Sequence, residues 1–137
     1  SMLPRDLRVR QLLRAVPSQD ELVEDQLIAR IRNQYVDELS GGERRYLEIR
    51  LVLALDRAYA LLDEPFTGVE PKLIDRISDL IVATARKGRG VLVTDHYHHY
   101  TVPIADDAYL MLDKQCRRLD GGDIKHQLVR MGYIHGG

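Results

Sequence analysis

The apolar positions of the chain follow a helical period in the first third and the pattern of short strands further on. Leucine and valine positions between residues 7 and 13 predict a short helix, and the apolar positions from Leu22 to Ile31 recur at the three- and four-residue spacing of one further helix. No run typical of a strand occurs before residue 57. The N-terminal third is therefore predicted to be helical.

Two short apolar runs predict neighbouring strands of a parallel sheet. The first covers residues 59–62 and ends in two carboxylates and a proline at residues 63–65, a pattern typical of a strand buried on both faces. The second covers residues 91–95. An amphipathic helix lies between them, with Pro71 in its first turn and Gly88 at its end. A strand, a helix and a strand in this order predict a right-handed parallel crossover.

A third helix is predicted from about Glu43 to Leu55. Ser40 precedes Glu43 by three residues, which is the pattern of a capping box. On its own this pattern indicates no more than a well-capped helix. Gly41 and Gly42 give it a second interpretation, because uncovered backbone N–H groups at a helix N-terminus, together with the helix dipole, favour a bound phosphate.

The C-terminal part predicts strands at residues 108–112 and 116–119, arranged as a hairpin, and a closing helix at residues 123–131. The length of 137 residues fits one domain or part of one. A net charge of −1 gives no general attraction to nucleic acid or to anionic lipid. The single cysteine excludes an internal disulfide and favours a reducing compartment.

The carboxylates Asp63 and Glu64 are the strongest candidates for chemistry. Ligands of open α/β sheets bind outside the carboxyl ends of the strands, where both residues are expected. His96 follows the second strand and is expected at the same edge. Adjacent carboxylates repel each other, so a bound cation and a reaction that needs a base would account for the pair. The alternative is a strand that runs into a turn, since Asp and Pro both favour turns.

Taken in order, four short motifs resemble the second half of the nucleotide-binding domain of ATP-binding cassette (ABC) proteins. Residues 39–45 resemble the signature motif, residues 61–65 the Walker B strand with its catalytic glutamate, residues 67–70 the D-loop and residues 94–96 the H-loop. Residues 3–9 resemble the segment that follows the Q-loop. The resemblance spans nearly the whole chain, whereas each motif alone is weak evidence.

The resemblance implies a role for each motif residue. Asp63 would bind Mg²⁺, Glu64 would orient or deprotonate the attacking water, and His96 would contact the γ-phosphate. The signature would contact ATP held by the opposite subunit of a head-to-tail dimer, and the D-loop would cross the dimer interface. The nucleotide-binding residues implied in these two motifs are Ser40, Gly41, Gly42, Glu43, Gly68 and Glu70.

Two substitutions and one absence set the chain apart from the family pattern. Glu70 stands where the D-loop usually has Asp, and Glu43 stands where the signature often has Gln. The sequence contains no G-x-x-x-x-G-K-[ST] loop, the element that grips nucleotide phosphates with backbone amides and a lysine. The chain thus looks like a C-terminal portion without Walker A and the Q-loop, and we expect it to be inactive in isolation.

The expected fold is therefore α/β, a partial P-loop NTPase of the ABC type. We expect a helical signature subdomain at residues 3–45, the second half of a mostly parallel ATPase core at 46–113, and a hairpin with a helix at 114–137. The resemblance is greatest to the stand-alone ATPase subunits of transporters such as lipopolysaccharide exporters and branched-chain amino-acid importers. It implies ATP and Mg²⁺ as cofactors and ATP hydrolysis coupled to transport in the complete protein.

The implied partners are a second ATPase domain and membrane-spanning subunits, which would dock on the helical subdomain. Neither nucleic acid nor direct membrane insertion is expected, and the implied location is the cytoplasmic face of a membrane. Two alternatives stay open: a non-transport ABC ATPase of the DNA-repair, chromosome-maintenance or translation type, and a naturally truncated binding module without catalysis. Asp63, Glu64 and His96 argue against the binding module, because a non-catalytic domain does not need them.

Two further groups of residues are candidates for a metal site and for a nucleic-acid patch, and neither is predicted. His96, His98 and His99 lie close together in sequence, but no cysteine or carboxylate follows at zinc-ligand spacing. Arg44 and Arg45 are expected on a solvated helix face, because the neutral net charge does not favour a nucleic-acid patch.

Overall fold

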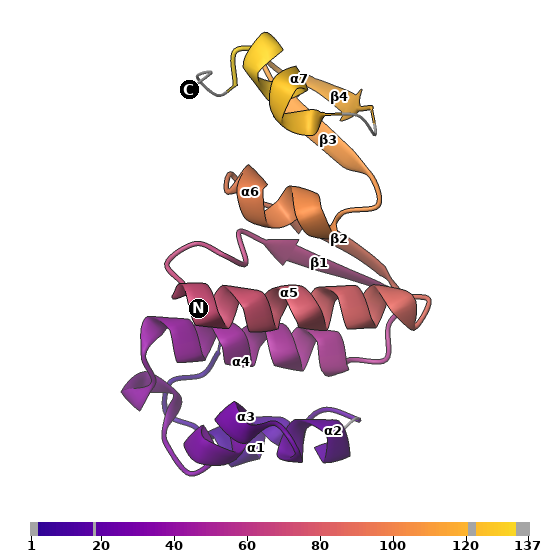
Figure 1. Cartoon of the computed structure of the whole chain (residues 1–137). Helices are drawn as coiled ribbons and strands as arrows, with labels where there is room; N and C mark the ends of the chain where they lie inside the picture. Colours follow the sequence, from indigo (N-terminus) through magenta and orange to yellow (C-terminus); the bar gives the residue numbers. More distant parts are fainter. Residues whose placement is uncertain (1–2, 18, 121–122, 134–137) are drawn as a thin grey trace. The chain divides into compact units, whose positions relative to one another are not determined.

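The computed structural model describes residues 3–17, 19–120 and 123–133, and the chain forms two compact units, Ser1–Tyr97 and His98–Gly137. Figure 1 shows the elements of both units. In chain order they are α1 (Val9–Leu13), α2 (Gln19–Val23), α3 (Gln26–Ile31), the 3₁₀ helix η1 (Val36–Glu38), α4 (Gly41–Ala54), β1 (Tyr59–Asp63), α5 (Pro71–Arg86), β2 (Gly90–Thr94), α6 (His98–Thr101), the 3₁₀ helix η2 (Val102–Ile104), β3 (Ala108–Leu112), β4 (Gln115–Leu119) and α7 (Ile124–Arg130).

The N-terminal third is helical, as predicted, with one isolated antiparallel bridge between Arg8 and Tyr35. The prediction of a single helix from Leu22 to Ile31 is wrong, because α2 and α3 are separate. The carboxylate of Asp25 accepts the backbone N–H groups of Leu27 at 2.9 Å and Ile28 at 3.2 Å. An Asp at this position starts a new helix by capping it, although the apolar spacing continues through the break.

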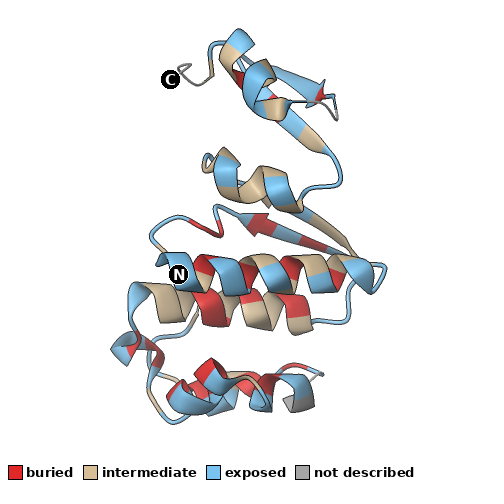
Figure 2. Cartoon of the chain, viewed as in Figure 1, coloured by how far each residue is buried: buried red, intermediate tan, exposed pale blue. Residues whose placement is uncertain are grey.

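Helices α4 and α5 lie side by side along one side of the β1–β2 pair (Figure 1). Their buried residues lie mainly along the faces that pack within the unit (Figure 2). The capping box of α4 is present, with Ser40 Oγ accepting from Glu43 N at 3.1 Å and Glu43 Oε2 accepting from Ser40 N at 3.0 Å. Pro71 opens α5, as predicted, and Gly88 follows its end with φ +86°.

Strands β1 and β2 pair in parallel, from Tyr59 opposite Gly90 to Asp63 opposite Thr94. The prediction that β1 is buried on both faces is wrong for the described chain. Ala60 and Leu62 face the helices and are buried, whereas Tyr59 and Leu61 are 76% and 71% exposed. Leu92, which is paired with Leu61, is also exposed. The sheet therefore has one packed face and one open apolar face.

A buried polar cluster joins α4 and α5 to the start of α3. Besides capping α3, Asp25 accepts a 2.5 Å hydrogen bond from the Tyr46 hydroxyl. Asp25 also forms ion pairs with Arg50 at 3.4 Å and with Arg76 at 3.7 Å. The Arg76 guanidinium lies 5.5 Å from the centre of the Tyr46 ring. Burial, followed by the bond to Asp25, raises the pKa of Tyr46 well above its usual value.

The second unit is built on the β3–β4 hairpin, which is antiparallel as predicted. Asp113 and Lys114 form its two-residue turn with φ of +50° and +61°, the backbone that matches the twist of such a hairpin. Leu110, Leu119 and Leu128 make a small core in which α7 covers the hairpin.

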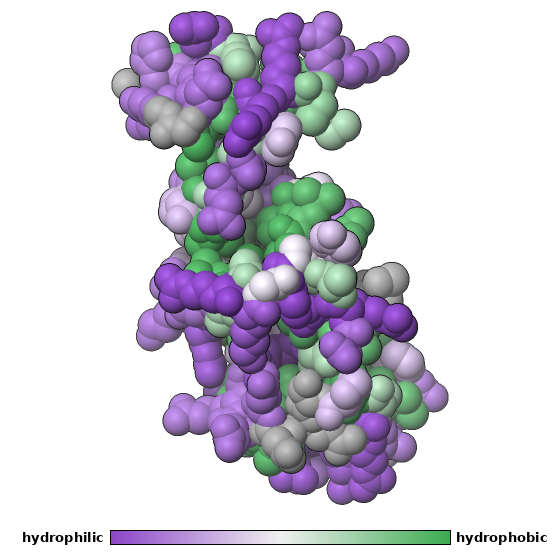
Figure 3. All heavy atoms as spheres, turned by 90° about the vertical axis from the view of Figure 1, so that its right-hand side faces the viewer, coloured by the Kyte–Doolittle hydropathy of each residue, from purple (hydrophilic) through white to green (hydrophobic). Residues whose placement is uncertain are grey.

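Hydrophilic side chains predominate on the face of the molecule drawn in Figure 3, with hydrophobic groups gathered in patches between them. No helix within the described ranges combines the length and the apolar content that a bilayer span requires.

Candidate functional site

The predicted site residues Asp63, Glu64 and His96 come together at the carboxyl ends of β1 and β2. Asp63 is the last residue of β1, and its Oδ1 accepts a 2.6 Å hydrogen bond from the hydroxyl of Thr94, its partner across the sheet. This bond fixes the carboxylate and occupies one of its two oxygens. Asp63 is exposed at the carboxyl end of β1, where a cation can reach its carboxylate.

Glu64 follows the strand in a left-handed backbone conformation, with φ +49°. Such a conformation costs a residue with a Cβ atom about 1–2 kcal/mol. The backbone N–H of Glu64 donates to Thr94 O at 2.7 Å, which continues the ladder by one bond before the chain turns away. The side chain of Glu64 is 53% exposed and points to solvent beside the sheet.

His96 approaches Glu64 from the neighbouring strand. Its Nδ1 lies 3.9 Å from Glu64 Oε1, which is longer than a hydrogen bond, and 3.8 Å from Asp95 Oδ1. Catalytic contacts are often long without substrate and shorten when it binds. The prediction that parallel pairing brings Glu64 and His96 to one edge is confirmed by this geometry.

Sequence reasoning missed Asp95, whose side chain is fully buried. Its Oδ2 accepts from the backbone N–H of Phe66 at 3.0 Å, and its Oδ1 accepts from that of Tyr97 at 2.9 Å. Asp95 thus holds the loop after β1 and the segment after β2 in a fixed relation, with Glu64 and His96 between them. A buried carboxylate needs such donors, and the sequence signal for it was an acid at the end of an apolar run.

The sequence did not indicate the backbone contacts of Arg44 and Arg45, which are partly exposed on α4. Arg44 donates to the carbonyls of Val36, Asp37 and Leu39, and so holds the segment that leads into α4. Arg45 reaches the end of β1 through the carbonyls of residues 63 and 64. Both guanidinium groups act as donors to the backbone, a use that net charge and helical spacing do not reveal.

The other motif residues lie apart from Glu64 and His96. Ser40, Gly41 and Gly42 form the N-terminus of α4, whose first N–H groups have no acceptor within the helix. The Ser40 hydroxyl accepts from Glu43 N and keeps its own O–H to donate. In the described chain no hydrogen bond or ion pair joins these residues to Glu64 or His96.

The predicted D-loop lies between β1 and α5. Gly68 has φ +70°, which glycine adopts without the penalty that a Cβ atom brings. Glu70 is exposed and stands at the N-cap of α5 without a capping hydrogen bond from its side chain.

Metal ligands of the kind that zinc requires are not grouped in the structure. Among the residues that the structure describes, His, Cys, Asp and Glu nowhere form a group of three or more suited to a metal ion. His98 and His99 stack edge to face within α6. A lone exposed carboxylate such as that of Asp63 is compatible with Mg²⁺, because that ion commonly takes one or two carboxylates together with substrate phosphates and water.

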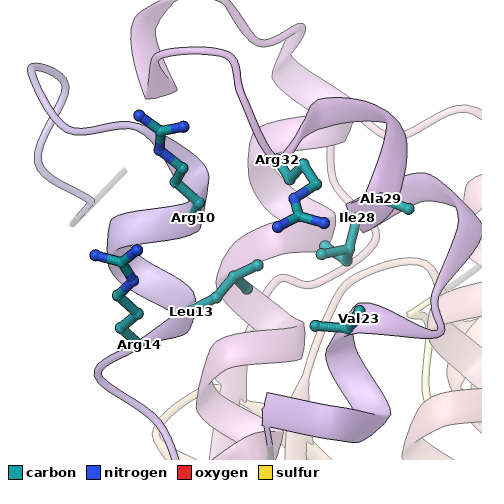
Figure 4. A pocket seen from close by; sticks show the side chains of 7 residues that line it. All are labelled: Arg10, Leu13, Arg14, Val23, Ile28, Ala29 and Arg32. Atoms are coloured by element: carbon teal, nitrogen blue, oxygen red, sulfur yellow. The ribbon is translucent and has the colours of Figure 1, made fainter.

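A small cavity of about 140 Å³ lies between α1, α2 and α3 (Figure 4). Apolar side chains line part of it, among them Val23, which is half exposed. Three arginines, Arg10, Arg14 and Arg32, also line it. The cavity combines positive charge with an apolar surface and lies away from the carboxylates at the sheet edge.

Curated proteins with similar sequences are ATP-binding proteins of transporters. The chain is 42% identical over 92 residues to the lipopolysaccharide export system ATP-binding protein LptB of Haemophilus influenzae, covering 67% of this chain and 38% of that protein. For the protein of the same name in Escherichia coli K12, the identity is 39% over 108 residues, covering 77% and 45%. A probable ABC transporter ATP-binding protein of Azorhizobium caulinodans is 41% identical over 92 residues, covering 67% and 33%. The chain spans less than half the length of these relatives.

Solved structures with a similar fold cover nearly the whole chain. A nucleotide-free ATP-binding cassette from an ABC transporter matches with a TM-score of 0.73 at 19% identity, covering 95% of this chain and 63% of that one. The ATP-binding subunit of an ABC transporter matches with a TM-score of 0.74 at 16% identity, covering 99% and 61%. The archaeal ribosome recycling factor aABCE1, in complex with a stalk protein, matches with a TM-score of 0.69 at 19% identity, covering 82% and 24%. These likenesses confirm the predicted fold class. No protein-family model matches the chain.

Proposed function

Because this chain belongs to the ATP-binding cassette family and contains its signature, Walker B, D-loop and H-loop motifs, we propose that it forms the C-terminal part of a transporter ATPase subunit. The observation that carries this proposal is the approach of His96 Nδ1 to Glu64 Oε1 at 3.9 Å, beside Asp63, at the carboxyl edge of a parallel sheet. A capped helix or a strand that ends in a turn needs no such grouping. The sequence relatives at 39–42% identity also favour transport over the repair and translation types.

In the proposed reaction Glu64 acts on the attacking water. Its carboxylate is exposed, and its backbone is held on both sides, so it can orient the water and accept its proton. His96 then donates to the γ-phosphate from the neighbouring strand. The protein would contribute positioning and charge stabilisation, without a covalent intermediate, as in other phosphoryl transfers.

Asp63 would hold Mg²⁺ through the carboxylate oxygen that Thr94 leaves open. When bound, the ion would neutralise charge on the β- and γ-phosphate oxygens. The first-turn amides of Gly41 and Gly42 and the Ser40 hydroxyl would contact the γ-phosphate of an ATP bound to the second subunit. Gly68 and Glu70 would form the crossing loop of that dimer.

The isolated chain is proposed to bind ATP weakly and not to hydrolyse it. Within its 137 residues no G-x-x-x-x-G-K-[ST] sequence supplies the amide cradle and lysine that hold the phosphates. ATP turnover is therefore to be measured on the complete ATPase domain.

The helical segment of residues 3–45 is proposed as the docking face for membrane-spanning subunits. The cavity lined by Arg10, Arg14 and Arg32 supports this role, because its size, charge and apolar lining suit one acidic side chain of a docking helix. The subunit would then work at the cytoplasmic face of a membrane. The relatives named for lipopolysaccharide export support a transport role without fixing the substrate of this chain.

The test is Glu64→Gln in the complete ATPase domain. Loss of the base should lower ATP turnover by about 10²–10⁴-fold, while ATP binding and the ATP-bound dimer persist. Asp79→Asn is the matched control, because Asp79 is an exposed carboxylate on α5. Turnover by Glu64→Gln equal to that of the control would overturn the assignment.

A further inference from the structure

Arg45 connects the helix that begins at the signature to the end of the strand that carries the catalytic carboxylates. It lies in the second turn of α4, and its Nη2 donates to Asp63 O at 2.9 Å and to Glu64 O at 2.8 Å. Its other terminal nitrogen, Nη1, lies 3.3 Å from Glu48 Oε2, one turn further along the same helix. One guanidinium is thus held by its own helix and donates to two consecutive carbonyls at the site.

These two carbonyls belong to the last paired residue of β1 and to the residue that follows it, where the sheet stops fixing the backbone. The ladder between β1 and β2 ends with Asp63 opposite Thr94, and only the N–H of Glu64 continues it. The chain then turns with Glu64 at φ +49°, a conformation that persists only where its surroundings impose it. Thr94 holds the N–H side of Glu64. On the carbonyl side Arg45 donates at 2.8 Å, and the backbone N–H of Thr67 donates over a longer 3.3 Å.

We propose that Arg45 is a positioning residue for ATP hydrolysis, which fixes the backbone of Glu64 and hence the direction of its carboxylate toward His96. The inference rests on the function proposed above and adds a residue that the four motif roles do not include. Arg45 does not touch the reacting atoms, since both bonds of its Nη2 go to the backbone. Its effect on the base passes through the main chain of Glu64.

The same bonds tie Glu64 to the N-terminus of α4. Ser40, Gly41 and Gly42 begin the helix on which Arg45 lies one turn later. A phosphate that binds at the start of α4 therefore acts on a helix whose side chain already holds the base of its own subunit. Arg45 thus gives each subunit a short mechanical link between its signature and its Glu64.

Loss of Arg45 should lower turnover and leave ATP binding nearly unchanged, because the phosphates do not depend on its guanidinium. A displacement of about 1 Å at a reacting group can cost about 10²-fold in rate. Lysine is a point donor on a flexible chain and cannot reproduce the fork of a guanidinium. Arg45→Lys should reach one carbonyl and keep part of the rate.

The experiment compares Arg45→Gln, Arg45→Lys, Glu64→Gln and Arg89→Gln in the complete ATPase domain, measuring kcat, KM for ATP and thermal midpoint. Arg89 is the matched control, because it also donates to two backbone carbonyls, those of Leu53 near the end of α4 and Arg57 before β1, away from Glu64. We expect kcat to fall about 10²-fold in Arg45→Gln, less in Arg45→Lys, and hardly at all in Arg89→Gln. KM should stay within about twofold in all of them.

The outcomes separate the inference from the function on which it rests. Full kcat in Arg45→Gln, with Glu64→Gln inactive, overturns the role of Arg45 and leaves the proposed function standing. Full turnover in Glu64→Gln overturns the proposed function itself. If kcat falls equally in Arg45→Gln and Arg89→Gln, and in proportion to the drop in their thermal midpoints, Arg45 only stabilises the fold. This result also overturns the inference. If Arg45→Gln does not fold, a lower kcat in Arg45→Lys at unchanged midpoint supports it, and wild-type kcat overturns it.

Discussion

Replacing Asp25 tests whether the buried polar cluster holds the helical segment to the rest of the first unit. The side chain of Asp25 is 8% exposed. It has five partners: the backbone N–H groups of Leu27 and Ile28, the Tyr46 hydroxyl, Arg50 and Arg76. Asp25→Ala removes the acceptor for all of them at once. Asp25→Asn keeps one carbonyl oxygen that can cap α3, replaces the oxygen that accepts from Tyr46 with an NH₂ group, and removes the negative charge.

The expected loss of stability follows from these contacts. Loss of the helix cap costs about 1 kcal/mol, and an unpaired buried hydroxyl costs about 1–3 kcal/mol. Arg50, whose side chain is 13% exposed, would keep a buried charge without its partner. Breaking a buried ion pair in this way costs about 3–5 kcal/mol. This figure overlaps with the costs of the lost cap and of the unpaired Tyr46 hydroxyl, so the three are not added. We therefore expect about 4 kcal/mol for Asp25→Ala and about 3 kcal/mol for Asp25→Asn, which can keep the helix cap of about 1 kcal/mol but breaks the same ion pair with Arg50.

Urea unfolding followed by far-ultraviolet circular dichroism measures both losses. With a denaturant dependence of about 2 kcal/mol per molar, 4 kcal/mol shifts the midpoint by about 2 M. Glu21→Gln is the control, because its ion pair with Lys87 is about two-thirds exposed on both sides and such pairs contribute about 0.5 kcal/mol. If Asp25→Ala shifts the midpoint no more than Glu21→Gln does, the cluster does not hold α3 to α4 and α5, and the reasoning is wrong.

Three further predictions concern the pH dependence of stability, the D-loop and the helix cap. Burial raises the pKa of Tyr46 in the folded chain above its unfolded value. The contribution of Tyr46 to the free energy of unfolding is therefore complete below pH about 10 and is lost at higher pH, by up to about 1.4 kcal/mol per pH unit. Tyr46→Phe should flatten this decline in unfolding measurements between neutral and alkaline pH, and an unchanged slope would contradict the prediction. Gly68→Ala should lower the free energy of unfolding by about 1 kcal/mol through its positive φ alone, since open space surrounds the added Cβ. Gly41→Ala is the control: its added Cβ is equally unobstructed but its φ is not positive, so it should not destabilise the chain in the same urea assay. Ser40→Ala should cost about 1 kcal/mol and Ser40→Asp much less, and equal midpoints for the two would exclude the cap as the cause.

The elements and one pair of site residues could be predicted from the sequence because they depend on local pattern and on a general rule of parallel sheets. Apolar runs set β1 and β2, and parallel pairing then brought Glu64 and His96 to the same edge. The capping box before α4 is equally local, since Ser40 and Glu43 satisfy each other within one turn.

The features that escaped prediction depend on contacts between distant residues. The break before α3 interrupts an apolar spacing that itself continues, and it is set by the buried Asp25 that also binds Tyr46. Arg45 carries no signal in sequence that separates it from a solvated arginine, because its acceptors are backbone carbonyls 18 and 19 residues away. The alternation of burial in β1 was masked because both of its faces are apolar, although only one is packed.

The open apolar face of the β1–β2 pair has a consequence for how this chain is judged in the laboratory. Tyr59, Leu61 and Leu92 present aromatic and aliphatic surface to solvent from a rigid, hydrogen-bonded backbone. Dyes such as ANS bind exposed apolar surface, and their fluorescence is commonly taken as a mark of a molten state. A well-packed preparation of this chain would fluoresce with ANS as well. Sharp near-ultraviolet dichroism from its tyrosines is therefore the proper criterion of its native packing.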